Sequence, residues 1–277
     1  MAKQKQLVPV AAVAVAVIFL LWLVRPLFCG ELNGTFQSKR LPSEYQQFKN
    51  FVASQPEFFR TFWVPRRQRF GFWFNDHPAI DAEKYLTVNQ CQEPFCSLMV
   101  PLPKQWGQDC PPNDRCYVRE LAYFLNPQSV VALSRMAVKY VVIPLDSLEE
   151  IFIAERQYNP QQRQEAESLL DTVSWLKKVT VADGVAVYEL PEFEDHFFII
   201  GENAPSIDWE KLSTSQYQVH INAASRPFQL IFSETFHPSW QAKLGGAEIP
   251  SQTTNDGLNA FSISQTGNFN LVVELAR

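Results

Sequence analysis

Two stretches decide the fold class: KYVVIP at residues 139–144 and LKKVTVADGVAVYEL at residues 176–190. The first is a short, continuous apolar run of the kind that buried strands show. The second predicts a β-hairpin, because the turn residues ADG separate two runs rich in valine and tyrosine. Helix patterns begin at residues 126–127 and 159–160, both Asn-Pro, and alternate with these strands. The alternation predicts an α/β (or α+β) domain.

Upstream of these strands, one more helix and one more strand are expected. Apolar residues recur at helical spacing from Pro42 to Ser54, and Ser43 is the expected N-cap. The aromatic and β-branched run RTFWVP at Arg60–Pro65 is typical of a strand. Both elements extend the α/β domain toward the N-terminus.

The periodicity changes at about His196, where strand patterns follow one another without a helix pattern between them. Six strand candidates are FFIIG (197–201), YQVHINA (217–223), PFQLIFSE (227–234), WQAKLG (240–245), AFSIS (260–264) and FNLVVEL (269–275). Short strands at close intervals, separated by turn residues, predict an antiparallel β-sandwich. We therefore expect an anchor over 1–30, an α/β domain over 31–200 and a β-sandwich over 201–277.

A transmembrane helix is predicted at Leu7–Val24, LVPVAAVAVAVIFLLWLV, eighteen residues without a charge. Lys3 and Lys5 precede it, so the N-terminus is expected in the cytoplasm and the folded domains outside it. A cleaved signal peptide is the alternative. The apolar run is longer than the usual signal core and lacks a small-x-small pair before Gly30, which favours an uncleaved, single-pass anchor in the cell membrane.

Four cysteines lie close together in the segment that follows the first predicted strand. They are Cys91, Cys96, Cys110 and Cys116, within 26 residues. An even cluster in an exported chain predicts two disulfides, with all three pairings open. Zinc binding is disfavoured because the spacings are C-x4-C and C-x5-C. The role of Cys29 is left open between a buried thiol, a lipid attachment and an intermolecular bridge.

The composition restricts the function classes. The net charge of −5, without a basic stripe, argues against nucleic acid as a partner, and the chain holds no phosphate-loop, metal-site or nucleophile motif. No cofactor is therefore expected. One basic and aromatic run stands out, with Arg66, Arg67, Arg69 and Trp73. It predicts either a grip on an anionic lipid head group or pyrophosphate-linked sugar, or a solvated loop over packed aromatic rings.

Two further groups of side chains are candidates for chemistry. Glu234, His237 and Trp240 suit a sugar platform, in which a ring stacks on the sugar and polar groups bind its hydroxyls. The alternative is that Trp240 fills the sandwich core. Asp76, with a histidine beside it and Asp81 nearby, offers acid–base groups, but Asn-Asp-His-Pro is more typical of a turn.

Four segments resemble a known family: AVKYVVIP (137–144), LKKVTVADGVAVYELP (176–191), FQLIFSETFHPSWQAKLGGAEIP (228–250) and NDGLNAFSISQTGNFNLVVEL (255–275). They are similar to the extracytoplasmic soluble region of bacterial polytopic membrane proteins of the GT-C glycosyltransferase type, including the YfhO-like family. The matching residues are Tyr140, Val141, Val142, Val187, Tyr188, Glu189, Leu190, Ser233, Glu234, Pro238, Trp240, Ala242 and Gly246. The resemblance covers most of 41–275. It implies the soluble part of such an enzyme without its many membrane helices or its catalytic loop.

Together these observations predict a non-catalytic, membrane-anchored, extracytoplasmic protein associated with membrane glycan synthesis or glycosyl transfer. Its expected partners are the membrane, glycosyltransferase subunits, and carbohydrate or a lipid-linked sugar. The alternatives are a glycoside-acting hydrolase that uses Asp76, Asp81 or Glu234, and a structural envelope protein that mediates protein contacts.

Overall fold

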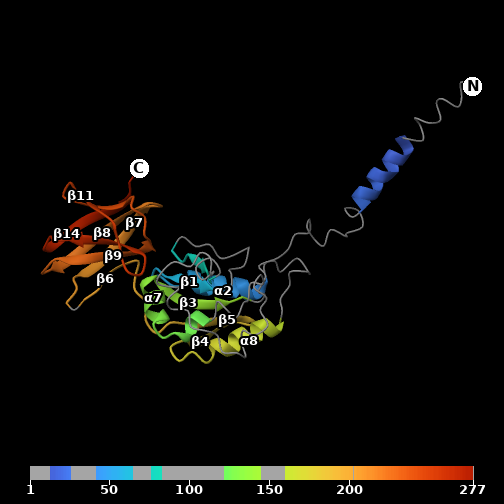
Figure 1. The fold of residues 1–277 in the computed structure, drawn as a ribbon, viewed down its shortest axis with the longest axis horizontal. Coiled ribbons are helices and arrows are strands. Elements are labelled where there is room, and N and C mark those ends of the chain that lie inside the picture. Colours follow the sequence, from blue (N-terminus) through green and yellow to red (C-terminus); the bar gives the residue numbers. More distant parts are fainter. Residues whose placement is uncertain are drawn as a thin grey trace, which may run out of the picture.

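The computed structural model of the chain describes residues 13–25, 42–64, 76–82, 122–144, 160–201 and 203–276. A mixed α/β region comes first, and a region of antiparallel sheets follows it, as the change of periodicity predicted. Figure 1 shows the C-terminal strands, orange to red, beside the α/β region. We call them the α/β region and the β region.

The α/β region is built on a mixed five-stranded sheet with the order β2-β1-β3-β5-β4. Its strands are β1 (Arg60–Trp63), β2 (Ala79–Asp81), β3 (Val138–Ile143), β4 (Lys177–Ala182) and β5 (Val185–Glu189). β1 runs parallel to β2 and β3, whereas β5 is antiparallel to β3 and β4. The predicted hairpin is confirmed as β4-β5. Gly184 in its turn has φ 79°, a conformation that glycine adopts without strain.

In the described part of this region, four helical elements accompany the sheet. They are α2 (Ser43–Ala53), the 3₁₀ helix η1 (Ala122–Leu125), α7 (Ser129–Arg135) and α8 (Pro160–Leu170). Ser43 was predicted to be the N-cap of α2. It is instead the first helical residue, and Pro42 is the N-cap. The helix begins one residue earlier than expected, because the Gln46 amide donates to the carbonyl of Pro42 (3.1 Å).

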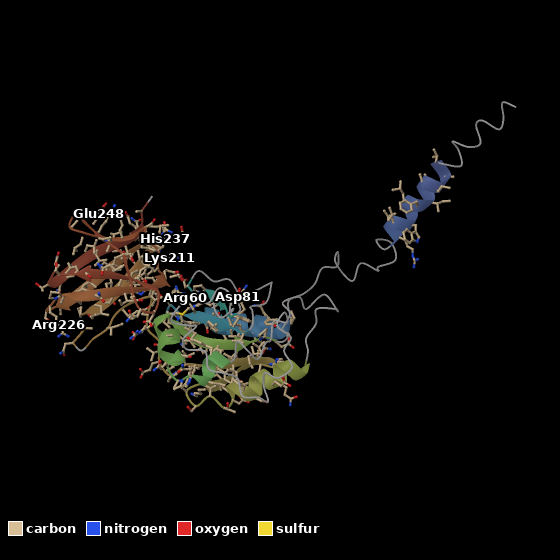
Figure 2. All side chains as sticks on the ribbon, viewed as in Figure 1. Arg60, Asp81, Lys211, Arg226, His237 and Glu248 are labelled. Atoms are coloured by element: carbon tan, nitrogen blue, oxygen red, sulfur yellow. The ribbon has the colours of Figure 1, made fainter. Side chains whose placement is uncertain are left out.

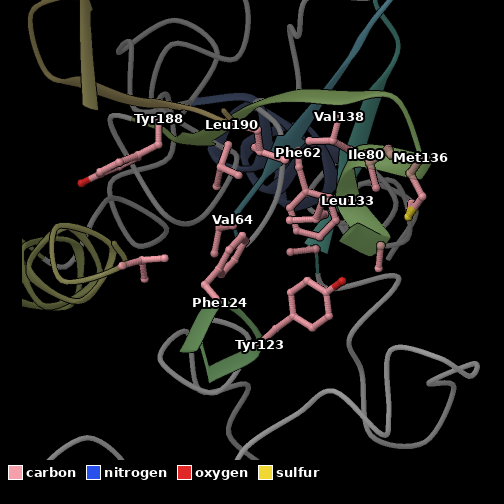
Figure 3. Packing of buried hydrophobic residues seen from close by; sticks show 14 of the residues in the cluster. Phe62, Val64, Ile80, Tyr123, Phe124, Leu133, Met136, Val138, Tyr188 and Leu190 are labelled. Carbon is pink, nitrogen blue, oxygen red and sulfur yellow. The ribbon is translucent and has the colours of Figure 1, made fainter. Parts of the chain in front are cut away.

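Side chains alternate between the two faces of the mixed sheet, as the period of two in a strand requires. On one face Trp63 and Val142 pack with Phe48 of α2. On the other face Phe62 and Val141 pack with side chains of η1, α7 and α8. Figure 3 shows this second cluster, with Phe62 against Phe124 and Leu133. The sheet is therefore covered on both sides.

The β region consists of two antiparallel sheets. The four-stranded sheet has the order β12-β13-β9-β6, and the five-stranded sheet has the order β11-β10-β14-β8-β7. Their bounds are β6 (Phe197–Ile199), β7 (Ser206–Ser213), β8 (Gln216–Ala224), β9 (Phe228–Thr235), β10 (Trp240–Leu244), β11 (Ala247–Pro250), β12 (Gln252–Thr253), β13 (Leu258–Ile263) and β14 (Gly267–Leu275). All six predicted strands are present.

Two features of the β region differ from the sequence-based expectation. Strand β7 (Ser206–Ser213) was not among the six predicted strands, although it pairs with β8 along its length. Strand β6 precedes residue 201 but pairs with β9, so it belongs to the β region. The first of these misses arose because charged residues interleave the apolar Ile207 and Trp209 of an edge strand.

The four-stranded sheet is buried on both faces where it meets the α/β region. Phe197 and Phe232 point into the core shared with the five-stranded sheet. Their neighbours Phe198 and Ile231 point the other way and join the cluster that contains Leu133 of α7. The contact between the two regions is therefore a continuous apolar layer.

Residues 13–25 form a helix whose large apolar side chains, from Val13 to Val24, are 41–67% exposed. Within the described ranges, no helix combines the length and the apolar character that crossing a bilayer requires. Residues 7–12 of the predicted anchor lie outside these ranges.

Candidate functional site

Arg60 is a charged side chain buried at the contact between the two regions, only 5% exposed. Its Nη1 donates to the carbonyl of Met136 and to Oγ of Ser233, both at 2.8 Å. Its Nη2 donates to Oε1 of Glu234 at 2.6 Å. The first residue of β1 is thereby tied to the end of α7 and to β9. Figure 2 shows Arg60 on the side of the α/β region that faces the β region.

The local backbone places Arg60 there. Its amide donates to the carbonyl of Ala137 at 2.7 Å, and the register between β1 and β3 shifts at this residue. Ala137 itself has φ 57°, which is uncommon for a residue other than glycine. This turn between α7 and β3 aims the carbonyl of Met136 at the guanidinium.

His196 completes the cluster from the β-region side. Its Nδ1 lies 2.8 Å from Oγ of Ser233. Because Arg60 donates to the same oxygen, the serine hydroxyl is free to donate its proton to Nδ1. The other ring nitrogen then carries the hydrogen and faces Oε1 of Glu234 at 3.9 Å. We call these four residues the junction cluster: Arg60, His196, Ser233 and Glu234.

Aromatic rings enclose the imidazole of His196. The centroids of Phe58, Phe232, Trp209 and Tyr217 lie 4.0, 4.8, 5.1 and 5.1 Å from it. Burial holds the pKa of His196 well below its ordinary value, and the positive charges of Arg60 and Lys211 lower it further. The histidine is therefore neutral at neutral pH.

The same surroundings act on the neighbouring phenol. Burial raises the pKa of Tyr217 to about 12, and the negative charge of Glu234 contributes in the same direction. Tyr217 therefore stays protonated at neutral pH. The junction cluster thus holds one permanent cation, one carboxylate and several neutral groups.

A serine hydrogen-bonded to a histidine also occurs in nucleophilic catalysis, but there the serine is accessible to the substrate. Ser233 is 4% exposed and His196 is 1% exposed. A nucleophile must reach its substrate, and the guanidinium of Arg60 occupies the serine oxygen. The arrangement is suited to fixing two regions against each other.

Two more contacts support the junction. Arg135 of α7 forms an ion pair with Asp256, which precedes β13. Asn259, fully buried, donates to the carbonyls of Glu234 and Thr235 at 2.8 and 3.1 Å. The asparagine holds the end of β9 in the conformation that presents Glu234 to Arg60.

The structure separates the residues of the predicted sugar platform. Glu234 turns to Arg60, with its side chain 40% exposed. His237 is exposed, as Figure 2 shows, and its Nδ1 accepts from the amide of Ser239 at 3.2 Å. Trp240 packs edge-on against Phe232, with centroids 4.9 Å apart, and joins the core of the β region. The core interpretation of Trp240 fits this placement.

The group around Asp76 is divided in the same way. Asp76 is exposed in a bend, whereas Asp81 is buried in β2 and 5% exposed. His77 stacks on Phe59 with centroids 4.1 Å apart, and its Nε2 lies 3.2 Å from the carbonyl of Gln55. No group of histidine, cysteine and carboxylate side chains in the described part of the chain is arranged to hold a metal ion.

The remaining predicted residues lie outside the described ranges. They are Arg66, Arg67, Arg69, Trp73, Cys29, Cys91, Cys96, Cys110 and Cys116. The grip on an anionic ligand and the two disulfides therefore stay predictions.

A second polar cluster lies around Lys139, at the start of β3. Its ammonium group pairs with Glu57 and donates to Oε1 of Gln55 at 2.5 Å. It also lies 5.2 to 5.5 Å from the ring centroids of Phe59, Tyr140 and Phe193. These three rings surround the ammonium group of Lys139 itself, so the aromatic cage is a structural feature and not a site for an external cation.

Sequence reasoning missed Arg60, His196 and Ser233 as a cluster. One signal was available: a single arginine opens the buried run RTFW, and a single histidine precedes the apolar run FFII. A buried charge requires a partner. Its identity could not be read, because Ser233 is 173 residues away along the chain.

No family model matches the chain, and neither a curated protein nor a solved structure matches it. Among the described residues, the junction cluster joins polar side chains from distant parts of the chain, with Arg60, His196 and Ser233 buried.

Proposed function

We propose that this protein is a non-catalytic extracytoplasmic module, held at the cell membrane by one N-terminal helix, that works with membrane glycan synthesis or glycosyl transfer. It would consist of an α/β domain followed by an antiparallel β-sandwich behind that anchor. Its partners would be membrane glycosyltransferase subunits and carbohydrate or a lipid-linked sugar.

One observation carries the non-catalytic part of the proposal. The described side chains best suited to acid–base or nucleophilic chemistry are occupied at the junction. Arg60 donates to Ser233 and Glu234, and His196 is hydrogen-bonded to Ser233. A catalytic group needs access to substrate and a pKa near the working pH. The buried serine and histidine lack that access, and the pKa of His196 is held low. They serve the joint between two domains.

The anchor rests on the sequence. An uncharged run at Leu7–Val24, with lysines before it, is typical of a signal anchor with its N-terminus inside. The exposed apolar side chains of the helix over residues 13–25 agree with an apolar environment for that segment. The clustered cysteines favour an oxidising compartment for the folded domains.

The association with glycan synthesis rests on the family resemblance. Most of the matching residues lie on β3, β5, β9 and β10, which are interior strands of their sheets. A module of this kind acts by binding, so its surface rather than a reactive centre would carry the activity.

The experiment is capture of partners in the native membrane. The full chain, with a C-terminal affinity tag, is expressed in its own cells, crosslinked and purified in detergent. Enrichment of polytopic glycosyltransferase-type proteins over a matched control is expected. The control is a chain with the same anchor and an unrelated folded domain. Equal recovery of these proteins with both chains would refute the association.

The hydrolase remains a second candidate because the carboxylate of Glu234 is 40% exposed, which leaves it within reach of solvent. Sugar release from cell-envelope glycans would be measured for the wild type and for Glu234→Gln. We expect no release above background from either protein. Release that disappears in Glu234→Gln, with the fold intact, would establish the enzyme instead.

A further inference from the structure

A hollow in the surface lies at one end of the β region, away from the junction cluster. It is a cavity of about 290 Å³ between the segment that follows β6 and the loop that joins β8 to β9. Figure 2 shows Arg226, which lines it, on the side of the β region opposite to Arg60. Loops at the end of packed sheets are common places for binding sites, because the sheets hold them rigidly.

Part of the wall is apolar. Ile199 and Phe228 are half-buried and pack against the core of the β region, so their positions are fixed by it. Ile200 stands beside them and is 56% exposed, although it is a large apolar side chain. This part of the cavity is an apolar surface held in place by the core, and its burial by a ligand would be favourable.

The rest of the wall is polar and exposed. Ser225, Arg226 and Asn203 bring a hydroxyl, a guanidinium and an amide to the cavity. Asn203 has φ 55°, and Gly201 has φ 138° with open space where a side chain would point. The space beside Gly201 is therefore open.

An apolar wall opposite hydrogen-bonding groups restricts the class of ligand. A pyranose ring has an apolar face of C–H groups and a rim of hydroxyls that donate and accept hydrogen bonds. Ligand pockets in proteins start at about 300 Å³, so this cavity holds one ring and not a chain of rings. The charged group among its described lining residues is Arg226, which can bind a hydroxyl or a sugar carboxylate.

We propose that this cavity binds a single pyranose ring of a glycan, with the ring on Phe228 and Ile200 and the hydroxyls toward Ser225 and Asn203. The inference rests on the proposed function and names a ligand class and a place for it. The place differs from the predicted platform at Trp240, which faces the core.

The test is saturation-transfer NMR on the full chain in micelles of a detergent without a sugar head group. The probes are maltose, cellobiose, N,N′-diacetylchitobiose and digalacturonic acid. The first three carry neutral rings and the last carries carboxylates, so the comparison shows whether Arg226 selects an acidic ring. Saturation of the ring protons of at least one probe is expected, because they would lie on Phe228.

The deciding variant is Ser225→Ala combined with Asn203→Gly, because glycine keeps the backbone conformation at 203. Each lost hydrogen bond should weaken binding about fivefold. The matched control is Ser213→Ala, at the far end of β7, where the hydroxyl accepts from the Ser215 amide at 3.3 Å. Thermal unfolding midpoints of all variants are compared with the wild type.

Weaker binding in the double variant, with unchanged binding in Ser213→Ala, supports the cavity. Equal binding in the double variant and the wild type overturns it, while carbohydrate binding elsewhere on the chain stands. Absence of binding for every probe also overturns it. The association with glycosyltransferase subunits is then decided by partner capture, which does not depend on this cavity.

Discussion

Two clusters in this molecule each pair a basic residue with a glutamate, but in different surroundings. The junction cluster joins Arg60 to Glu234, with Ser233 and His196 beside them, and Arg60 is 5% exposed. On the open face of the five-stranded sheet, Lys243 of β10 joins Glu274 of β14 at 2.7 Å. Gln216 and Gln241 also donate to Glu274, at 2.9 and 3.4 Å, so it has as many partners as Arg60.

The difference between the clusters is solvent. In water a charge pair gains little, because each ion loses hydration and the field is screened. At the junction, removal of one member leaves the other without water to replace it. The number of contacts is therefore a poor guide to the stabilisation, and burial decides it.

Truncation of Arg60 should have the largest effect. Arg60→Ala removes three hydrogen bonds and leaves the Ser233 hydroxyl and the Met136 carbonyl buried without their donor. The free energy of unfolding should fall by about 3 kcal/mol, at the lower end for a buried pair because Glu234 is partly exposed. Urea unfolding of the full chain in micelles, followed by circular dichroism, measures this.

Arg60→Lys serves as the comparison variant. It keeps the charge but cannot form the forked contacts to Ser233 and Glu234 together, so its loss should be intermediate. A loss below about 1 kcal/mol in Arg60→Ala, the range of exposed pairs, would show that burial does not set the weight of this cluster.

The apolar layer next to the cluster should rank second. Ile231, 3% exposed, packs on the α/β region, and Ile231→Ala should lower the free energy of unfolding by about 2 kcal/mol. Val272 lies on the open face of the five-stranded sheet, next to Lys243 in the register, and serves as the control. Val272→Ala should cost about 0.5 kcal/mol or less. Similar losses in both variants would contradict a buried contact between the regions.

The pH dependence of stability should reveal His196. The pKa of His196 is lowered in the folded chain. As the pH falls below about 6.5, this histidine therefore binds a proton in the unfolded chain while it stays neutral in the folded chain. Stability is then lost by about 1.4 kcal/mol per pH unit from this one group. His196→Gln should reduce the slope between pH 6 and 5 by that amount. Urea unfolding at several pH values measures the slope.

Two other histidines define the controls for that slope. Burial also lowers the pKa of His77, so part of the slope should persist in His196→Gln. His237 is exposed and lies outside the junction cluster, so His237→Gln is the matched substitution with which His196→Gln is compared. A slope that is the same in His196→Gln and the wild type would mean that the imbalance of protons lies elsewhere.

The order of strands and helices was largely readable from the sequence, because it depends on local periodicity. The run KYVVIP became β3, and the six apolar runs after His196 became strands of the β region. The helix whose pattern begins at residues 159–160 ends at Leu170, where a turn follows it, although apolar residues continue beyond that point. Boundaries depend on tertiary packing, which local patterns do not contain.

The candidate site could not be read in the same way. Glu234 was singled out with His237 and Trp240 because these residues are close in sequence. Along a strand, neighbouring residues point to opposite faces, and a turn separates β9 from β10. The partner of Glu234 is Arg60, 174 residues away. Only the three-dimensional arrangement joins them.

Disruption of the open-face pair, Lys243 and Glu274, should have the smallest effect on the free energy of unfolding. Lys243 lowers the pKa of Glu274, and Glu274 raises that of Lys243, so the two charges do interact. Both stay in contact with water, however, and the attraction should be largely cancelled by lost hydration and side-chain freedom. Lys243→Met should leave the unfolding midpoint within the reproducibility of the measurement.

A cycle of Lys243→Met, Glu274→Gln and the double variant, in low salt and in about 1 M salt, isolates the pair, and any coupling should vanish in high salt. Coupling that survives high salt would place this exposed pair in the class of the junction cluster, and burial would no longer explain the difference between them.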